Sequence, residues 1–454
     1  MIACRETLVL IRKSLFLVVG AILVSCGSTS TAVPREGTSQ QATQPSAHGT
    51  PLDQTTMQPG TTAQAGQASA WIAADAHLHG HGCGGQREAQ DLYDLLQPAS
   101  LDIASALVWG EGYEDDRPFF TGQDWEGSTP GRIIHYDLEV SAFAAAQMGH
   151  QVILGLSSLD FPDQLSSLPV ADWAHEQGAV DGFAHAGTWP TGGAFPIAVE
   201  SGNVPFEAPI LAALGKLDFL EVEQVMTHEG EWSNGITALW YPLLNSGFAI
   251  PILGGSDYPC LPDGAGTVRT LFPASAGTGY EGWLNAIRTG QSVVAGNRPG
   301  WLDISVNGQG MGSTLDVASG ESVEVVVSAN LAEAGIVEIV VNGAVQDSAQ
   351  VSAGESRTAF TIPLIASSWI AARAPGFHTS PIYVRVDGEP IRASAADADY
   401  FVRFIDDLLR QIDAGAFTYH DYSAEQIRAE FAAVRDLYLA AREVFVQRAT
   451  ESQQ

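Results

Sequence analysis

Two histidines separated by a single residue, His77 and His79, stand at the end of the apolar run Trp71–Ala74. If this run is a strand, residues two apart point to the same face, so both imidazoles can bind one metal ion. An isolated pair of this kind proves little, because buried or surface histidine pairs without metal are common. The pair becomes informative through the residues that follow it.

Further candidate ligands lie beside strand-like runs between residues 133 and 257. In a barrel of parallel strands, active-site groups gather at the carboxyl ends of the strands. Histidines and carboxylates placed there in succession suit zinc, manganese or iron better than calcium. We therefore expect a cluster of metal ligands at one rim of the fold. The candidates are Glu139, His150, His185, Glu221 and Asp257.

Seven strand-like runs must position these residues, and most of them precede a helical pattern. The alternation predicts parallel βα units. Seven units favour a barrel one unit short of eight, and an open doubly wound sheet is the alternative. The glycine-rich phosphate turn typical of such sheets is absent after the first run. The strand runs are 71–74, 101–108, 133–138, 151–156, 180–184, 217–222 and 250–256, and the helical patterns are 87–97, 141–148, 170–177, 206–214 and 236–244.

One connection, residues 110–132, is long and combines six acidic residues with Phe119, Phe120 and Trp125. It follows the second strand, so it should lie on the ligand-bearing face. Long structured loops in compact domains are commonly lids or binding loops. An insertion without a catalytic part is equally open at this stage.

The pattern changes after Pro299. Short strand-like runs with hairpin signals at Asn307-Gly308 and Asn342-Gly343 predict a small β-sandwich over residues 299–394. Residues 395–454 contain two amphipathic helices whose apolar stripes are typical of core rather than partner-binding surface. The stripes are Phe401, Phe404, Ile405, Leu408 and Ile412, then Ile427, Phe431, Val434, Tyr438, Ala441 and Phe445.

The first 69 residues read as an export and tethering segment. A basic flank and a short apolar stretch end in Leu23-Val24-Ser25-Cys26-Gly27, which resembles the lipobox of bacterial lipoproteins. The resemblance implies a signal peptide over 1–25 and a lipid on Cys26 that anchors an exported protein to a bacterial membrane. An ordinary signal peptide and a short anchor helix are the alternatives. Residues 26–69 lack apolar periodicity and predict a disordered tether.

The chain has a formal net charge of -31 and only two lysines, Lys13 and Lys216. This charge should repel nucleic acid, so we expect no nucleic-acid partner. Cys83 follows His79 closely, and Cys260 follows Asp257 closely. If His79 and Asp257 share a metal, both thiols lie on the same rim, and an exported protein can keep a disulfide between them. Coordination of the metal by a thiolate is the alternative.

The combined series of residues resembles the PHP (polymerase and histidinol phosphatase) domain, and its finer pattern resembles the CehA/McbA branch. The resemblance extends from about Trp71 to about Leu409 and implies a distorted (β/α)7 barrel, here over 70–298. It also implies a metal-dependent hydrolase, since the family mostly acts on phosphoesters. The matching stretches include Tyr136-Asp137-Leu138-Glu139-Val140, Gly149-His150, Ala184-His185, Leu243-Leu244-Asn245-Ser246-Gly247-Phe248 and Gly254-Gly255-Ser256-Asp257-Tyr258.

Residue by residue, the resemblance implies that His77, His79 and Asp257 hold one metal. By the same resemblance His150 and His185 hold a second, and Glu139 bridges the two. Many PHP enzymes have a histidine two places after the aspartate, where this chain has Pro259. We therefore expect two divalent ions, or one, rather than three. Zinc, manganese and iron are not distinguished by the ligand types.

Three further residues are candidates for catalysis. Arg269 could neutralise developing charge, although a structural ion pair is its alternative. His81 or Tyr258 could protonate a leaving group. His135 shares a strand face with Glu139 and could line the pocket, whereas Glu221 is a weaker candidate.

The expected function is hydrolysis of a small ester, either a phosphoester or a carbamate or carboxyl ester. One alternative is a surface-anchored binding or adhesion lipoprotein with an inactive site. Another is the amidohydrolase class, which also begins with H-x-H and ends with aspartate. That class commonly bridges its metals with a carboxylated lysine or a glutamate, and Lys216 precedes its strand instead of ending it.

Overall fold

The computed structural model describes residues 50–51, 71–141, 143–162, 164–190, 203–227, 230–417, 419 and 422–452. The predicted signal peptide with Cys26, and the tether apart from residues 50–51, lie outside these residues. In the described part of the chain, no helix is both long and apolar enough to cross a membrane.

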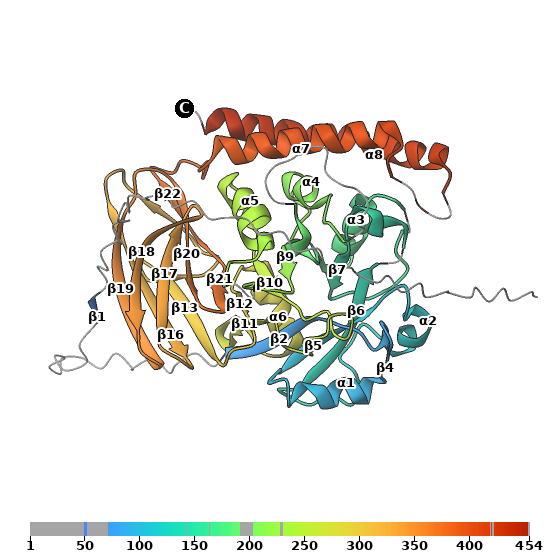
Figure 1. Ribbon diagram of the computed structural model, residues 1–454, viewed down its shortest axis with the longest axis horizontal. Coiled ribbons are helices and arrows are strands. Elements are labelled where there is room, and N and C mark those ends of the chain that lie inside the picture. Colours follow the sequence, from blue (N-terminus) through green and yellow to red (C-terminus); the bar gives the residue numbers. More distant parts are fainter. Residues whose placement is uncertain are drawn as a thin grey trace, which may run out of the picture. The chain divides into compact units, whose positions relative to one another are not determined.

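All seven strands predicted before residue 257 are present, and they are neighbours in one sheet (Figure 1). Strand and helix alternate along this part of the chain, so the predicted α/β class is confirmed, whereas closure of the strands into a barrel stays a prediction. The sheet order is β10-β9-β8-β7-β6-β5-β2. The strands are β2 (Trp71–Leu78), β5 (Ile103–Val108), β6 (Ile133–Val140), β7 (Gln151–Leu154), β8 (Val180–Phe183), β9 (Phe219–Val222) and β10 (Ile252–Gly254).

The prediction that these strands are all parallel is wrong at β7. This strand pairs antiparallel with both β6 and β8. The cause is the short connection between β6 and β7, because a parallel pair needs a crossover of about a dozen residues or more. The connection contains only a 3₁₀ helix, Ala144–Met148, where an α-helix was expected. The reversal places the start of β7 at the same edge as the end of β6.

Helices cover both faces of these strands. α1 (Ala89–Leu96) and α3 (Leu168–Glu176) pack on the face that carries Ala104, Ala106 and Val108. α6 (Gly279–Arg288) packs on the opposite face against Leu107 and Leu253. The alternation of neighbouring strand residues between two apolar cores is the reason for the nearly continuous hydrophobic runs in the sequence. α4 (Ala208–Ala213) forms as predicted, and the helix expected at 236–244 begins as a π-helix, Gly235–Trp240, and continues as α5 (Tyr241–Asn245).

The same sheet continues beyond β2 into the region after residue 299. β11 (Arg269–Pro273) pairs antiparallel with β2, and β12 (Val293–Ala295) pairs with β21 (Phe377–Thr379). The sheet has fifteen strands in all, so it crosses the expected domain boundary, and the domain limits stay predictions. Its remaining strands are β15 (Thr314–Val317), β17 (Gly335–Val341), β18 (Ala344–Val351), β20 (Ser368–Ala374) and β22 (Ile382–Val386).

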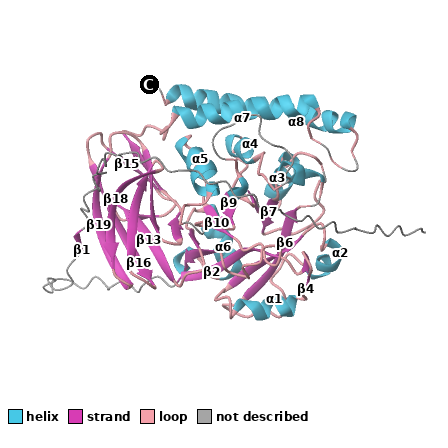
Figure 2. Ribbon diagram, viewed as in Figure 1, coloured by secondary structure: helices cyan, strands magenta, loops and turns pink. Residues whose placement is uncertain are grey.

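A second, five-stranded sheet has the order β1-β19-β16-β13-β14. Side chains from it share one apolar core with β17, β20 and β22 of the large sheet, so the two sheets face each other across this core. Asn307 and Asn342 adopt positive φ values of 47° and 51° at the two predicted hairpin turns. The strands are β1 (Thr50–Pro51), β13 (Gly300–Val306), β14 (Gln309–Gly310), β16 (Ser322–Leu331) and β19 (Gly354–Pro363). Figure 2 shows how strands dominate this region.

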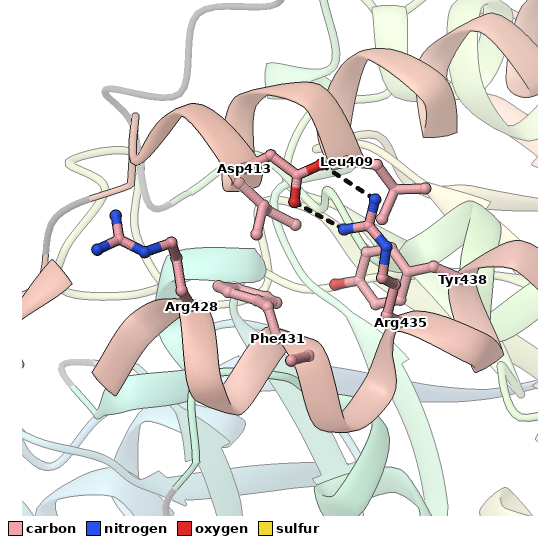
Figure 3. A pocket seen from close by; sticks show the side chains of 8 residues that line it. Leu409, Asp413, Arg428, Phe431, Arg435 and Tyr438 are labelled. Atoms are coloured by element: carbon pink, nitrogen blue, oxygen red, sulfur yellow. Dashed lines mark hydrogen bonds and ion pairs between the residues drawn. The ribbon is translucent and has the colours of Figure 1, made fainter. Parts of the chain in front are cut away.

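The chain closes with α7 (Ala395–Ala414) and α8 (Ala424–Glu451). Both predicted apolar stripes are buried, and Ser423 and Gln426 form the predicted capping box. Between the helices lies a hollow of about 100 Å³, bordered by the ion pair of Arg435 with Asp413 at 2.7 and 3.0 Å (Figure 3). The helices are therefore part of the core, as their pattern indicated.

Candidate metal centre

The six predicted ligands converge at one edge of the β2–β10 strands. His77 is the second-to-last residue of β2, His79 follows that strand, and Glu139 is near the end of β6. His150 precedes β7, and it joins the others because β7 runs antiparallel to its neighbours. His185 and Asp257 follow β8 and β10. Five of the six residues are buried, and His150 is partly exposed.

Four of these residues form a compact donor group. His79 Nε2 lies 3.1 Å from His77 Nε2, 3.5 Å from Glu139 Oε2 and 3.3 Å from Asp257 Oδ1. His77 Nε2 lies 3.6 Å from Glu139 Oε2 and 3.5 Å from Asp257 Oδ1. Donors at bond lengths of about 2.0–2.1 Å from a tetrahedral ion are separated by about 3.3 Å. The spacing of this four-donor group therefore fits a single ion.

A second group of three donors uses the other oxygen of Glu139. Its Oε1 lies 2.9 Å from His150 Nδ1 and 3.8 Å from His185 Nε2, and the two histidine nitrogens are 3.2 Å apart. Glu139 thus directs one oxygen to each group, which is the arrangement of a bridging ligand. A group of three protein donors leaves room for a further ligand, as catalytic sites require.

Two carboxylates behind the centre orient its histidines. Glu221 Oε1 lies 2.9 Å from His77 Nδ1, and Glu223 Oε1 lies 3.1 Å from His185 Nδ1. When these nitrogens donate their protons to the carboxylates, the Nε2 lone pairs face the donor groups. Glu221, a weaker candidate in the sequence, is thus in contact with the centre. Glu223 was missed, although the Glu-x-Glu spacing at the end of β9 is a usable signal.

Local backbone conformation also shapes the centre. His185 and Asp257 have φ values of 56° and 48°, in the left-handed region that non-glycine residues rarely adopt. Such strain is concentrated at functional sites. At Gly255 a Cβ atom would lie 2.5 Å from Glu221 Oε1 and 2.7 Å from His77 Cβ, so a glycine is needed where the chain passes this pair.

The electrostatics of the cluster favour positive charge. Burial lowers the pKa of His77, but Glu221, Glu139 and Asp257 outweigh burial and hold that pKa well above its usual value. Burial is likewise outweighed at His185, where Glu223 and Glu139 raise the pKa to about 10. Burial raises the pKa of Glu139, but His77 and His150 outweigh burial and hold that pKa well below its usual value. The buried carboxylates therefore attract cations, and the nitrogen and oxygen donors fit divalent transition metals.

The other predicted site residues have separate positions. The ring of His81 is held through Nδ1, 2.8 Å from the buried Asp116 Oδ1. Tyr258, next to Asp257, accepts a 2.7 Å hydrogen bond from Arg87 Nη2. Both residues are partly exposed at the rim.

The described hydrogen bonds of Arg269 go to the carbonyl oxygens of Ala99 and Arg298, at 3.0 and 3.4 Å, and its catalytic role stays a prediction. His135, which was expected to line the pocket, contacts other residues than the donor groups. It shares the β6 face of Glu139, but it lies toward the start of the strand, where its ring stacks on Tyr280 and Nδ1 pairs with Asp124.

The long connection after β5 contacts this rim. The Trp109 ring lies 4.5 Å from the ring of His79, and its Nε1 donates to the carbonyl oxygen of His81. Asp116 lies in the short helix α2 (Tyr113–Asp116). Cys83 and Cys260 form the predicted disulfide across the same rim. The connection and the disulfide therefore border the centre.

Comparisons with known proteins found solved structures that resemble this chain and no matching family. No family model matches the chain, and neither does any curated protein. One solved structure that it resembles is a two-domain protein from Bacteroides vulgatus ATCC 8482, named as containing a predicted PHP-like metal-dependent phosphoesterase. That protein is 13% identical, with a TM-score of 0.40, and the match covers 70% of this chain and 96% of the other. A likeness at this level does not assign this chain to a family.

Proposed function

We propose that this chain is a PHP-type, metal-dependent hydrolase that cleaves a small phosphoester or a carbamate or carboxyl ester. One observation carries the proposal. Glu139 directs its two oxygens to two separate groups of histidine and carboxylate donors. Such a shared carboxylate is typical of sites that hold two ions side by side. The quoted motifs support the PHP superfamily and its CehA/McbA branch as the origin of this arrangement.

Each residue of the centre has a role in this proposal. When bound, divalent ions supply Lewis acidity and make hydroxide available near neutral pH. Glu221 and Glu223 hold His77 and His185 in the required orientation. The Trp109 ring packs against one side of the His79 ring. His81, held by Asp116, and Tyr258 lie at the rim, where each can donate a hydrogen bond to a leaving group.

We also propose that the protein is exported and anchored to a bacterial membrane through a lipid on Cys26. The lipobox-like sequence and the polar segment behind it support this proposal. A tethered hydrolase would meet small esters outside the cytoplasm, and the net charge of -31 disfavours nucleic-acid substrates. Mass spectrometry of the membrane fraction tests the anchor, and an unmodified Cys26 contradicts it.

The experiment that tests the function combines metal analysis with an ester panel. The purified protein should contain up to two equivalents of zinc, manganese or iron. It should release nitrophenol from at least one of four esters: a phosphomonoester, a phosphodiester, a carbamate or a carboxyl ester. Asp257→Asn should lower both the metal content and the rate of nitrophenol release. His175→Ala is the matched control, because this partly exposed histidine pairs with Asp218 outside the centre.

The outcomes separate hydrolysis from the alternative. Absence of bound metal together with absence of turnover on every ester, after each of the three metals is supplied, overturns the proposal. Bound metal without turnover favours the binding or adhesion lipoprotein.

A further inference from the structure

One sulfur atom lies close to the four-donor group without belonging to it. Ligand atoms of His79, Asp257 and Cys260 all lie within 4.8 Å of one another. Cys260 is bonded to Cys83, and a disulfide sulfur is a poor ligand because metals bind the thiolate. The disulfide therefore conceals a potential ligand beside the centre.

Two backbone hydrogen bonds hold the turn that carries Cys260. The backbone N–H of Leu261 donates to the carbonyl oxygen of Asp257 at 2.8 Å, which closes a turn around Cys260. The N–H of His79 donates to the carbonyl oxygen of Tyr258, also at 2.8 Å. These bonds attach the turn to the strand end that carries the histidine ligands. Cys260 should therefore stay beside His79 and Asp257 when the disulfide is broken.

Cys83 lies at the tip of a short hairpin, in the two-residue turn between β3 (His81–Gly82) and β4 (Gly85–Gln86). It is exposed, and its φ of 48° lies in the left-handed region, between Gly82 and Gly84 with φ values of 103° and 77°. Positive φ values at both central residues are typical of a two-residue hairpin turn, so the turn itself accounts for the conformation of Cys83. The described hydrogen bond of its own backbone N–H is to Glu111 Oε2 at 3.2 Å. The two halves of the disulfide thus differ: Cys260 lies beside the centre, and Cys83 lies in an exposed turn that a reductant can reach.

We propose that reduction of the Cys83–Cys260 disulfide makes Cys260 an additional ligand of the four-donor group. The added ligand would change the centre from an active to a less active form. The inference rests on the metal centre proposed above. A dithiol is the reductant, and its thiolate attacks the exposed Cys83 sulfur, so that Cys260 is the leaving thiolate. The second thiol of the reductant then displaces Cys83 and closes the reductant's own disulfide. Two electrons pass to the cysteines, and Cys83 takes up a proton.

The consequence is a change in ligand field and in access. Cys260 would add a soft sulfur donor to two imidazoles and two carboxylates, and soft thiolates bind zinc and cobalt strongly. The added ligand would occupy space at the rim through which water or substrate approaches. The oxidised form is then the active form, and the reduced form holds its metal more firmly.

Cobalt spectroscopy tests this inference with a matched pair of variants. Cys83→Ser frees Cys260, whereas Cys260→Ser frees Cys83, and both lose the same cross-link. Cys4→Ser and Cys26→Ser are present throughout, so that no other thiol remains. Each protein is loaded with Co²⁺, alongside the disulfide-bonded parent and the parent reduced by a dithiol and then freed of reductant. A thiolate ligand gives a sulfur-to-cobalt charge-transfer band in the near ultraviolet.

We expect this band in Cys83→Ser and in the reduced parent, and its loss in Cys260→Ser and in the oxidised parent. Cobalt bound in all four samples without the band overturns the thiolate ligand but leaves the metal centre intact. Failure of the oxidised parent to bind cobalt overturns both proposals. If Cys83→Ser does not fold, the reduced parent decides the same question.

Discussion

The rim around His77 and the β-rich region beyond residue 299 differ in the types of side chain that they bury. At the rim, His77, His79, Glu139, Glu221 and Asp257 are all buried, and they contact one another through ionisable atoms. In the β-rich region, residues 300–394, the buried set is almost entirely aliphatic and aromatic. Its buried polar residues include no carboxylate.

This difference indicates what each region contributes. A buried charge is costly unless it is paired, and replacing such pairs by apolar residues often stabilises a protein. The rim therefore retains an arrangement that stability alone does not favour, whereas the β-rich region follows the rule of an apolar core. We expect substitutions at the rim to change metal binding and turnover, and substitutions in the β-rich region to change stability.

The strongest test removes a ligand from the four-donor group. His79→Ala should lose one metal equivalent and lower kcat/KM by roughly 10³-fold or more, because both charge stabilisation and the nucleophile depend on the metal. Metal analysis and steady-state kinetics on the best ester of the panel measure the two effects. Activity close to that of the parent in a metal-depleted His79→Ala, Asp257→Asn double variant would refute the mechanism.

The complementary test truncates the apolar core. Ile304 in β13 is 1% exposed and packs within the core between the two sheets. Ile304→Ala should lower the free energy of unfolding by about 2–5 kcal/mol, through lost burial and a cavity. Denaturant unfolding measures the change, and kcat per folded molecule should stay at the parent value. A large fall in kcat without a fall in stability would break the contrast between the regions.

Sequence reasoning could find the parts of the site that depend on local pattern. His77, His79, Glu139 and Asp257 were found because residue type and position at a strand end together constrain them. The antiparallel β7 was missed, although its short connection to β6 rules out a crossover helix. Glu223 was missed although it is two residues from Glu221, a spacing that places both carboxylates on one face of a strand end.

Side-chain direction was the least predictable feature. The Arg269 guanidinium reaches the Ala99 and Arg298 carbonyls, and that direction is set by tertiary packing rather than by sequence spacing. The left-handed φ of His185 is likewise imposed by its surroundings. Patterns of residue types thus locate a centre better than they define the contacts around it.

A smaller effect is expected for the carboxylates behind the ligands. Glu221→Gln keeps the shape of the side chain but removes the charge that orients His77 through Nδ1. Loss of such a partner typically weakens metal affinity about 10–100-fold. Competition with a chelator measures the affinity, and the exposed Glu231→Gln is a control of identical chemistry. Equal affinities of the two variants would show that Glu221 does not support the ligand.

The last prediction concerns the pH dependence of stability and His378, which lies where the β-rich region contacts α5. This residue of β21 is fully buried, and its Nε2 lies 2.6 Å from the hydroxyl of Tyr241 in α5. Burial lowers the pKa of His378 to about 3, so the folded protein keeps the ring neutral. Below its ordinary pKa the unfolded chain binds one more proton than the folded chain, so stability is lost as the pH falls from about 6.5 toward 3. The slope should be about 1.4 kcal/mol per pH unit.

Unfolding free energies of the parent and of His378→Gln, measured between pH 7 and pH 4, isolate this contribution from that of the carboxylates. The difference between the two proteins should shift in favour of the variant as the pH falls, because the variant has no ring to protonate. Parallel curves would mean that the unfolded and folded chains protonate His378 alike. In that case the contact of His378 with Trp240 and Tyr241 would not exclude water from the ring.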